Sequence, residues 1–214
     1  PIENSFDGVY KTIDGGDNWQ RTDDFFLGGM YSGFGWYFGK IRVDPNNPDI
    51  VYVLGINLMR SEDGGNSWKR ANFNVHVDQH GLDFFPDSSN IMVLGNDGGL
   101  YVSDDNAQNW RHSKTLPITQ FYECEVSQAQ LDHYFGGTQD NGTVMSDHGM
   151  WGNWRRILGG DGFHVIVDPE FPEIVYAEYQ WGNLFRSNDG GNTFQWARSG
   201  IDNEDRNNWN TPIE

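Results

Sequence analysis

The chain is poor in cysteine and in basic residues, and it has no long apolar run. Cys124 is the single cysteine among 214 residues, so neither an internal disulfide nor a cysteine-based zinc cluster can form. No apolar segment approaches the length that a membrane-spanning helix needs, so no membrane span is expected in this chain. Only 14 Lys and Arg residues stand against 31 Asp and Glu residues, and the formal net charge is −17. Such an acidic chain repels phosphate backbones, which argues against a nucleic-acid partner and leaves basic or uncharged ligands, glycans included.

Helical periodicity is nearly absent as well. Glycine occurs 27 times and aromatic residues make up 15% of the chain, a combination that favours short strands joined by tight turns. Cys124 falls within a predicted inner strand, and we expect a buried thiol there. The chain starts at Pro1 without a recognisable signal peptide, so we expect a processed protein or a piece of a longer one.

A short phrase with aspartate, glycine and a closing tryptophan or phenylalanine recurs along the chain. Three copies resemble one another closely (TIDGGDNW, SEDGGNSW and SNDGGNTF), and two have diverged (SDDNAQNW and SDHGMWGNW). The five copies occupy residues 12–19, 61–68, 103–110, 146–154 and 187–194. Their first residues recur about every 44 positions, which is the spacing of four-stranded propeller blades.

The same series of apolar segments flanks each copy of the phrase. One strand precedes the phrase directly (LMRS, LFRS), another lies further upstream (IVYVLG, IVYAEY), and an Asp- and Pro-rich turn comes before that one. A strand also opens each unit, and another follows the phrase. We therefore predict an all-β fold, namely a β-propeller segment of four-stranded antiparallel blades over residues 1–214. Its parts are a half blade at residues 6–22 and full blades at 37–72, 81–113, 121–157 and 163–198.

The recurring phrase resembles the Asp-box (BNR) repeat, most closely at residues 61–68 and 187–194. Together with the DPNNPD turn at 44–49, NDGG at 96–99 and GGTQDNGT at 136–143, it resembles large Asp-box propellers. These are related to sortilin-type receptor domains and to xyloglucan-cleaving glycoside hydrolases. The resemblance covers nearly the whole chain and implies that each Asp box forms the turn between the third and fourth strands of a blade.

The Asp boxes are expected to be structural. In residues 61–68 the Asp63 carboxylate can accept backbone N–H bonds of its own turn, and Ser61 can bond across it. Gly64 and Gly65 can take positive φ without a Cβ clash, and Trp68 is expected to pack between blades. Five copies at one period indicate a repeated structural need, because a catalytic centre is usually unique; calcium capture is the minor alternative.

The loops between second and third strands, and those that enter each blade, lie on the face opposite the Asp boxes. They differ from blade to blade, and such loops on a regular scaffold are where binding residues gather. They carry aromatic rings for stacking together with amide, imidazole and carboxylate groups. The candidate ligand-binding residues are Trp36, Tyr37, His76, Asp78, His80, Asn96, Gln139, Asn141 and Trp181.

Three acids of this face are candidate catalytic residues: Asp97, Asp140 and Asp161. A glycosidase needs two carboxyl groups across the scissile bond, one of them protonated. The xyloglucan-cleaving relatives carry a D-x-G-G stretch, and the matching register here has Asn96 at the catalytic position. The alternative is that the three acids cap their own glycine-rich loops. A sialidase is disfavoured because these loops contain no arginine to bind a sugar carboxylate.

The stretch HVDQH at residues 76–80 raises the question of a metal. In an extended conformation His76, Asp78 and His80 would share one face and could form a transition-metal set. Histidines at the start of an inner strand more often bond to neighbouring loops, so neither a metal nor another cofactor is expected.

These candidate residues leave two functions open. We favour an exported binding or interaction module that recognises a protein, peptide or glycan through these loops. The alternative is a glycoside hydrolase acting on a β-glucan-like polysaccharide with paired Asp carboxylates. The expected location is secreted, periplasmic or at the cell surface. Because residues 6–22 give only half a blade, we also expect further propeller blades outside this segment.

Overall fold

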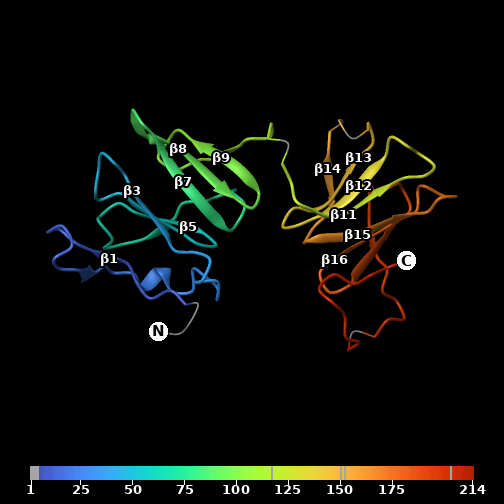
Figure 1. Ribbon diagram of the computed structural model, residues 1–214, viewed down its shortest axis with the longest axis horizontal. Helices are drawn as coiled ribbons and strands as arrows, with labels where there is room; N and C mark the ends of the chain where they lie inside the picture. Colours follow the sequence, from blue (N-terminus) through green and yellow to red (C-terminus); the bar gives the residue numbers. More distant parts are fainter. Residues whose placement is uncertain (1–4, 117, 150, 152, 203) are drawn as a thin grey trace. The chain divides into compact units, whose positions relative to one another are not determined.

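A computed structural model describes residues 5–116, 118–149, 151, 153–202 and 204–214. The chain divides into two compact units, Pro1–Pro117 and Ile118–Glu214, which we call unit 1 and unit 2 and describe separately (Figure 1). The prediction of one propeller segment over residues 1–214 stays a prediction.

Unit 1 contains a hairpin and two four-stranded sheets, which we number as blades 1 to 3. Blade 1 consists of β1 (Tyr10–Lys11) and β2 (Gln20–Arg21). Blade 2 consists of β3 (Lys40–Val43), β4 (Val51–Leu54), β5 (Leu58–Ser61) and β6 (Lys69–Arg70). Blade 3 consists of β7 (Gln79–Phe85), β8 (Ser88–Asn96), β9 (Gly99–Ser103) and β10 (Arg111–His112). A 3-10 turn, η1 (Phe25–Leu27), lies in the loop between blades 1 and 2.

Unit 2 contains two further four-stranded sheets, blades 4 and 5. Blade 4 consists of β11 (Phe121–Val126), β12 (Tyr134–Thr138), β13 (Gly142–Ser146) and β14 (Arg155–Leu158). Blade 5 consists of β15 (Gly162–Val167), β16 (Val175–Tyr179), β17 (Asn183–Ser187) and β18 (Gln195–Trp196).

Every sheet pairs its strands antiparallel and in chain order. This meander is the topology of a propeller blade, so the predicted all-β propeller fold of four-stranded blades is confirmed. In the described part of the chain no helix is long and apolar enough to cross a membrane.

The core of unit 1 lies between its sheets. β4 is buried along its whole length, because it is a central strand with packing on both faces. Tyr52, Leu54 and Leu58 of blade 2 pack with Leu82 and other side chains of blade 3. The opposite face of blade 2 packs against the hairpin and the loop after it, and Trp68 lies in that second cluster, only 8% exposed. The expected packing of Trp68 between blades is therefore observed.

Unit 2 repeats this arrangement. Phe135 and Met145 of blade 4 pack against Val165, Val175 and Ala177 of blade 5. The approach is close at Gly137, where a Cβ atom would lie 2.1 Å from the carbonyl oxygen of Phe163. Only glycine fits between strands at that separation.

The expectation of a buried Cys124 is wrong. β11 is the edge strand of blade 4, and five of its six residues are exposed, Cys124 among them. The prediction treated the first strand of the blade as an inner strand with buried side chains. In the structure this strand lies at the edge of its sheet, and its side chains are exposed.

The recurring phrase forms a tight turn that we call the Asp turn. In residues 61–68, Ser61 Oγ donates to Asp63 Oδ1 at 2.8 Å and accepts from Gly65 N–H at 2.8 Å. Asp63 Oδ1 also accepts from Ser67 N–H at 2.8 Å. Gly64 and Gly65 have φ of 70° and 97°. Side-chain and backbone hydrogen bonds from Ser67 lower the pKa of Asp63 to about 2.

The same bonds recur at three other copies. Thr12, Ser103 and Ser187 donate to Asp14, Asp105 and Asp189, respectively. In the diverged copy at 103–110, Asn106 and Ala107 take φ of 60° and 62° in place of the glycines. At the copy starting with Ser146 the hydroxyl instead donates to Gly149 O at 2.7 Å.

Replacing Asp63 with asparagine should destabilise the protein at pH 7. The pKa of Asp63 lies below its ordinary value of 3.8, so the stabilisation is complete above pH 4 and is lost as the pH falls towards 2. The difference between Asp63→Asn and the parent should shrink over that interval. Urea unfolding followed by tryptophan fluorescence from pH 7 to pH 2 measures it, with the exposed Asp17→Asn as the control. A difference that does not change with pH would contradict the prediction.

Candidate functional site

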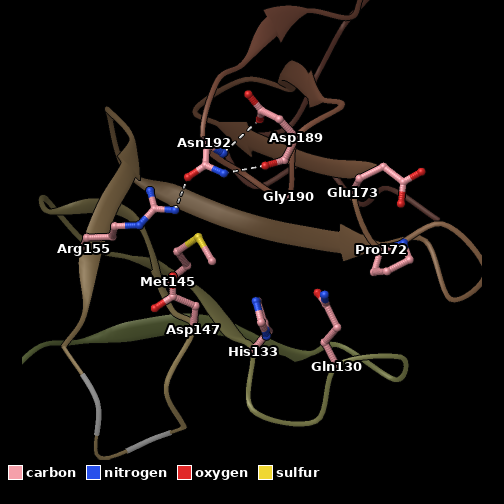
Figure 2. Close-up of a pocket in the computed structure, with 10 residues that line it drawn as sticks. All are labelled: Gln130, His133, Met145, Asp147, Arg155, Pro172, Glu173, Asp189, Gly190 and Asn192. Atoms are coloured by element: carbon pink, nitrogen blue, oxygen red, sulfur yellow. Dashed lines mark hydrogen bonds between the residues drawn. The ribbon is translucent and has the colours of Figure 1, made fainter.

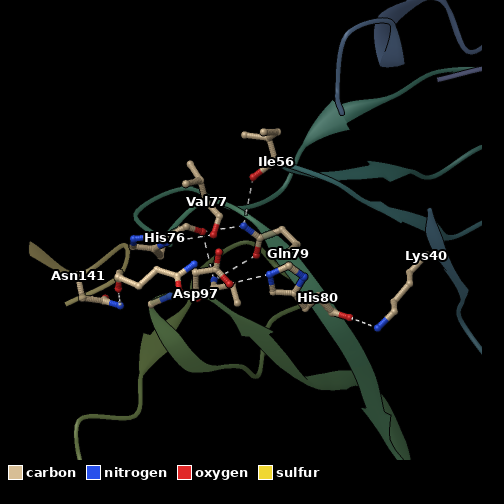
Figure 3. A network of polar contacts seen from close by, with 11 residues as sticks. Lys40, Ile56, His76, Val77, Gln79, His80, Asp97 and Asn141 are labelled. Carbon is tan, nitrogen blue, oxygen red and sulfur yellow. Dashed lines mark hydrogen bonds and ion pairs between the residues drawn. The ribbon is translucent and has the colours of Figure 1, made fainter. Parts of the chain in front are cut away.

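In unit 1 the candidate residues gather where the blade 3 strands begin and turn (Figure 3). His80 stands at the start of β7, and Asp97 lies in the two-residue turn between β8 and β9. Because these strands pair antiparallel, the turn comes back beside the start of β7. His80 Nε2 and Asp97 Oδ1 are 2.6 Å apart, and each side chain is 28% exposed. The pair is thus partly screened from water and still reachable.

Aromatic rings flank this pair. The Phe38 ring stacks parallel to the His80 imidazole with centroids 5.8 Å apart, and the Tyr37 ring meets it edge-on at 5.0 Å. Trp36 lies 5.3 Å from Tyr37, ring centroid to ring centroid. Trp36 and Tyr37 are 70% and 57% exposed, so their faces are open to a ligand.

Asn96 and Gln79 hold the surrounding loops together. Asn96 accepts from Gly98 N–H at 3.0 Å and donates to His76 O and to Gln79 Oε1, both at 3.2 Å. Gln79 is 1% exposed and donates to His76 O at 2.6 Å. These amides are therefore occupied in fixing the loop geometry. Sequence reasoning placed Asn96 here as a ligand-binding residue and missed Gln79.

The extended conformation considered for residues 76–80 is not found. Asp78 has φ of 65°, which breaks the alternation of a strand. His76 Nδ1 lies 3.1 Å from Val77 O, and His80 Nε2 faces Asp97. Among the described residues no group of three or more His, Cys, Asp or Glu side chains is placed to hold a metal ion. Burial, and then the charge of Asp97, raises the pKa of Asp78, while His76 and His80 oppose that rise.

In unit 2 two of the candidate acids come together. Asp140 lies in the turn between β12 and β13 with φ of 61°, and its N–H donates to Asp161 Oδ1 at 3.0 Å. Asp161 precedes β15 and is 7% exposed. The Gln139 N–H donates to Gln120 O, and the Asn141 N–H donates to Gln139 O. Asp161 thus stabilises the turn of Asp140, a different loop from its own, and Asp97 belongs to unit 1.

Trp181 occupies the turn between β16 and β17 of blade 5. Its φ is 67°, its N–H donates to Trp209 O at 3.0 Å, and its ring meets that of Trp209 at 5.2 Å and 87°. Gly182 adjoins Thr211 in the same contact. Trp181 nevertheless stays 53% exposed, so part of the ring remains open.

Sequence reasoning missed Glu178, which is fully buried in β16. Burial raises its pKa to about 7, opposed in part by the backbone N–H groups of His164 and Thr211. Within the described part of the chain neither carboxylate oxygen has a hydrogen-bond partner of standard geometry. Its register partner is Leu184, three residues before Ser187. The equivalent positions in blades 2, 3 and 4 are Leu54, Gly95 and Gly137. Aligning the repeats on their shared serines would have shown a carboxyl group in a position that other blades keep apolar or empty.

A pocket of about 270 Å³ lies beside the Asp turn of blade 5 (Figure 2). It is lined by Gln130, His133, Met145, Asp147, Arg155, Pro172, Glu173, Asp189, Gly190 and Asn192. Arg155 Nη2 donates to Asn192 Oδ1 at 2.7 Å, and Asp189 is bonded within its own turn. Groups of both signs line this space, which suits a small polar molecule. Sequence reasoning assigned this region to the scaffold and therefore did not find it.

Neither the protein-family models nor the curated proteins contain a match to this chain. Among solved structures, the chain is similar to a GH74 enzyme from Niastella koreensis, with 19% identity and a TM-score of 0.42, over 88% of this chain and 34% of that one. It is similar to the GH74 xyloglucanase from Xanthomonas campestris, with 20% identity and a TM-score of 0.43, over 88% and 34%. It is also similar to YCF48 from Cyanidioschyzon merolae, with 15% identity and a TM-score of 0.37, over 89% and 78%. The chain thus spans about a third of the length of the two GH74 structures.

Proposed function

We propose that this chain is part of an Asp-box (BNR) propeller, akin to those of sortilin-type receptors, and serves as a recognition module for a protein, peptide or glycan. The observation that carries the proposal is that polar loop residues are hydrogen-bonded while aromatic loop residues are exposed. Asp161 and Asn96 accept loop N–H bonds, whereas Trp36, Tyr37 and Trp181 expose half or more of their surface. Rigid polar loops that present open aromatic faces are suited to binding.

A glycoside hydrolase is the alternative function. It requires two carboxyl groups about 5–10 Å apart across an open cleft, one of them acting as an acid. Asp161 is buried and accepts a backbone N–H, so it is poorly placed to transfer a proton to a substrate. GH74 enzymes are among the similar structures, so hydrolysis is the outcome against which the proposal is tested.

Replacing Trp36 with alanine should weaken ligand binding about tenfold or more, because stacking on an exposed ring supplies much of such a contact. Trp19→Ala, which removes an exposed tryptophan of an Asp turn in the same unit, should leave binding unchanged. Binding is measured by calorimetry against xyloglucan and mixed-linkage glucan oligosaccharides and by anisotropy against a peptide library.

A parallel assay measures reducing-sugar release from the same polysaccharides by the parent protein and by an Asp97→Asn/Asp140→Asn/Asp161→Asn variant. We expect no release by either protein. Release by the parent that disappears in the variant would establish a hydrolase and overturn the recognition proposal.

The proposal also includes further blades and an exported location. Thr211 N–H lies against Glu178, just as the start of β15 lies against Gly137, the equivalent residue of blade 4. Such a contact is one that the first strand of a following blade would make, which supports the proposal of further blades. An intact propeller outside the cytoplasm would present its loops to extracellular partners.

A further inference from the structure

The loop that carries Trp36 and Tyr37 is firmly anchored beneath its exposed rings. Leu27, Met30 and Tyr31 are 9% exposed or less and belong to the core between blades 1 and 2. Successive turns follow, with Phe34 N–H donating to Tyr31 O at 2.7 Å and Tyr37 N–H donating to Phe34 O at 2.9 Å. The rings are thereby held in place before any ligand arrives, which lowers the entropic cost of binding.

Acidic side chains lie one residue away from these rings, across the His80 imidazole. Tyr37 contacts the His80 imidazole, which pairs with Asp97, and Asp78 is close enough to Asp97, His76 and His80 for their charges to shift its pKa. We call Trp36, Tyr37, Asp78, His80 and Asp97 the aromatic–acid surface. In the part of the chain that the structure describes, the Asp78 side chain makes no hydrogen bond or ion pair.

Lys40 is bonded to the main chain rather than to a carboxylate of this surface. Lys40 Nζ donates to the main-chain carbonyl of His80 at 2.6 Å (Figure 3). The candidate-face loops contain no arginine, and the chain as a whole carries a net charge of −17. The carboxylates thus belong to the same cluster as the open aromatic faces, and Asp97 pairs with the imidazole of His80.

We propose that the aromatic–acid surface binds an arginine- or lysine-bearing segment of a partner protein. A guanidinium or ammonium group stacks on Trp36 or Tyr37 as a cation on a ring face, while Asp78 and Asp97 supply the opposite charge. The acidic chain raises the rate of encounter with a basic partner. A neutral glycan could stack on the rings and donate hydroxyl hydrogen bonds to the carboxylates, but only a cationic group would also gain charge attraction. The inference rests on the proposed recognition function and names the partner of the unit 1 loops.

The test uses the intact chain and two fluorescein-labelled peptides, four Gly-Ser-Arg repeats and four Gly-Ser-Gln repeats. Anisotropy titrations in 50 and 300 mM NaCl measure their affinities. The arginine peptide should bind at least about tenfold more tightly than the glutamine peptide, and the added salt should weaken it. Trp36→Ala and Asp78→Asn should each weaken arginine-peptide binding about 5- to 30-fold.

Two controls match these variants. Trp19→Ala removes an exposed tryptophan of an Asp turn, and Asp87→Asn removes an exposed acid of the turn between β7 and β8. Both should stay within about twofold of the parent, and all four variants should unfold near the parent's urea midpoint. Equal binding of the two peptides, or binding confined to xyloglucan oligosaccharides, would overturn the inference and leave the recognition function standing. Binding of no probe at all would overturn both.

Discussion

Replacing Glu178 with glutamine should stabilise the protein at pH 8 by about 3 kcal/mol and leave its stability at pH 4 nearly unchanged. The parent carboxyl group is fully buried, and its pKa is raised from 4.5 to about 7. The folded state therefore binds a proton more tightly than the unfolded state does. The parent is most stable below pH 4.5, loses stability between pH 4.5 and 7, and changes little from this group above pH 7.

Urea unfolding followed by tryptophan fluorescence from pH 4 to pH 9 measures this effect. Glutamine keeps the shape of the side chain without its charge, so the slope between pH 4.5 and 7 should flatten in Glu178→Gln. Glu170→Gln, an exposed acid in the turn before β16, serves as the matched control and should follow the parent. Parallel pH profiles for the parent and Glu178→Gln would show that Glu178 does not titrate as a buried group.

Replacing Gly137 with alanine should destabilise the protein by about 2–3 kcal/mol or more. The added Cβ would meet Phe163 O at 2.1 Å and Gly162 C at 2.4 Å, and both are backbone atoms of the neighbouring blade. Blades 4 and 5 would have to move apart, which would loosen the core around Phe135 and Val175. Thermal and urea unfolding report the loss.

Gly159→Ala is the control for this substitution. Its Cβ would meet no atom within 4 Å, and its φ does not lie in the left-handed region. We expect a change of less than about 1 kcal/mol, of either sign. Equal losses at the two positions would mean that the destabilisation comes from backbone conformation rather than from contact between blades.

The sequence predicted the blades well because their information is local and repeated. The serine or threonine and the aspartate of four Asp turns, together with the apolar strands on either side, specify a turn and a sheet without reference to distant residues. The burial of β4 on both faces also follows from its continuous apolar run. The prediction of a buried Cys124 was wrong because burial of an edge strand depends on what packs beside it.

The candidate site was predictable only as a set of loops. That Asp97 meets His80, and that Asp140 meets Asp161, depends on turn conformations set by neighbouring strands. The positive φ of Asp78 prevents His76, Asp78 and His80 from sharing one face of an extended segment. No local sequence pattern signals that conformation. Glu178 escaped notice because a single carboxyl group inside an apolar strand resembles an ordinary solvent-facing position until the repeats are aligned.

The diverged Asp turn at residues 103–110 bears on how such repeats evolve. Asn106 and Ala107 hold the left-handed conformation that glycine holds elsewhere, while Ser103 and Asp105 keep their hydrogen bonds. The serine–aspartate clasp is thus strong enough to impose an unfavourable backbone on ordinary residues. Selection on the glycines can relax wherever that clasp persists. Duplicated blades can therefore lose the glycine pattern by which the repeat is recognised and still form the same Asp turn.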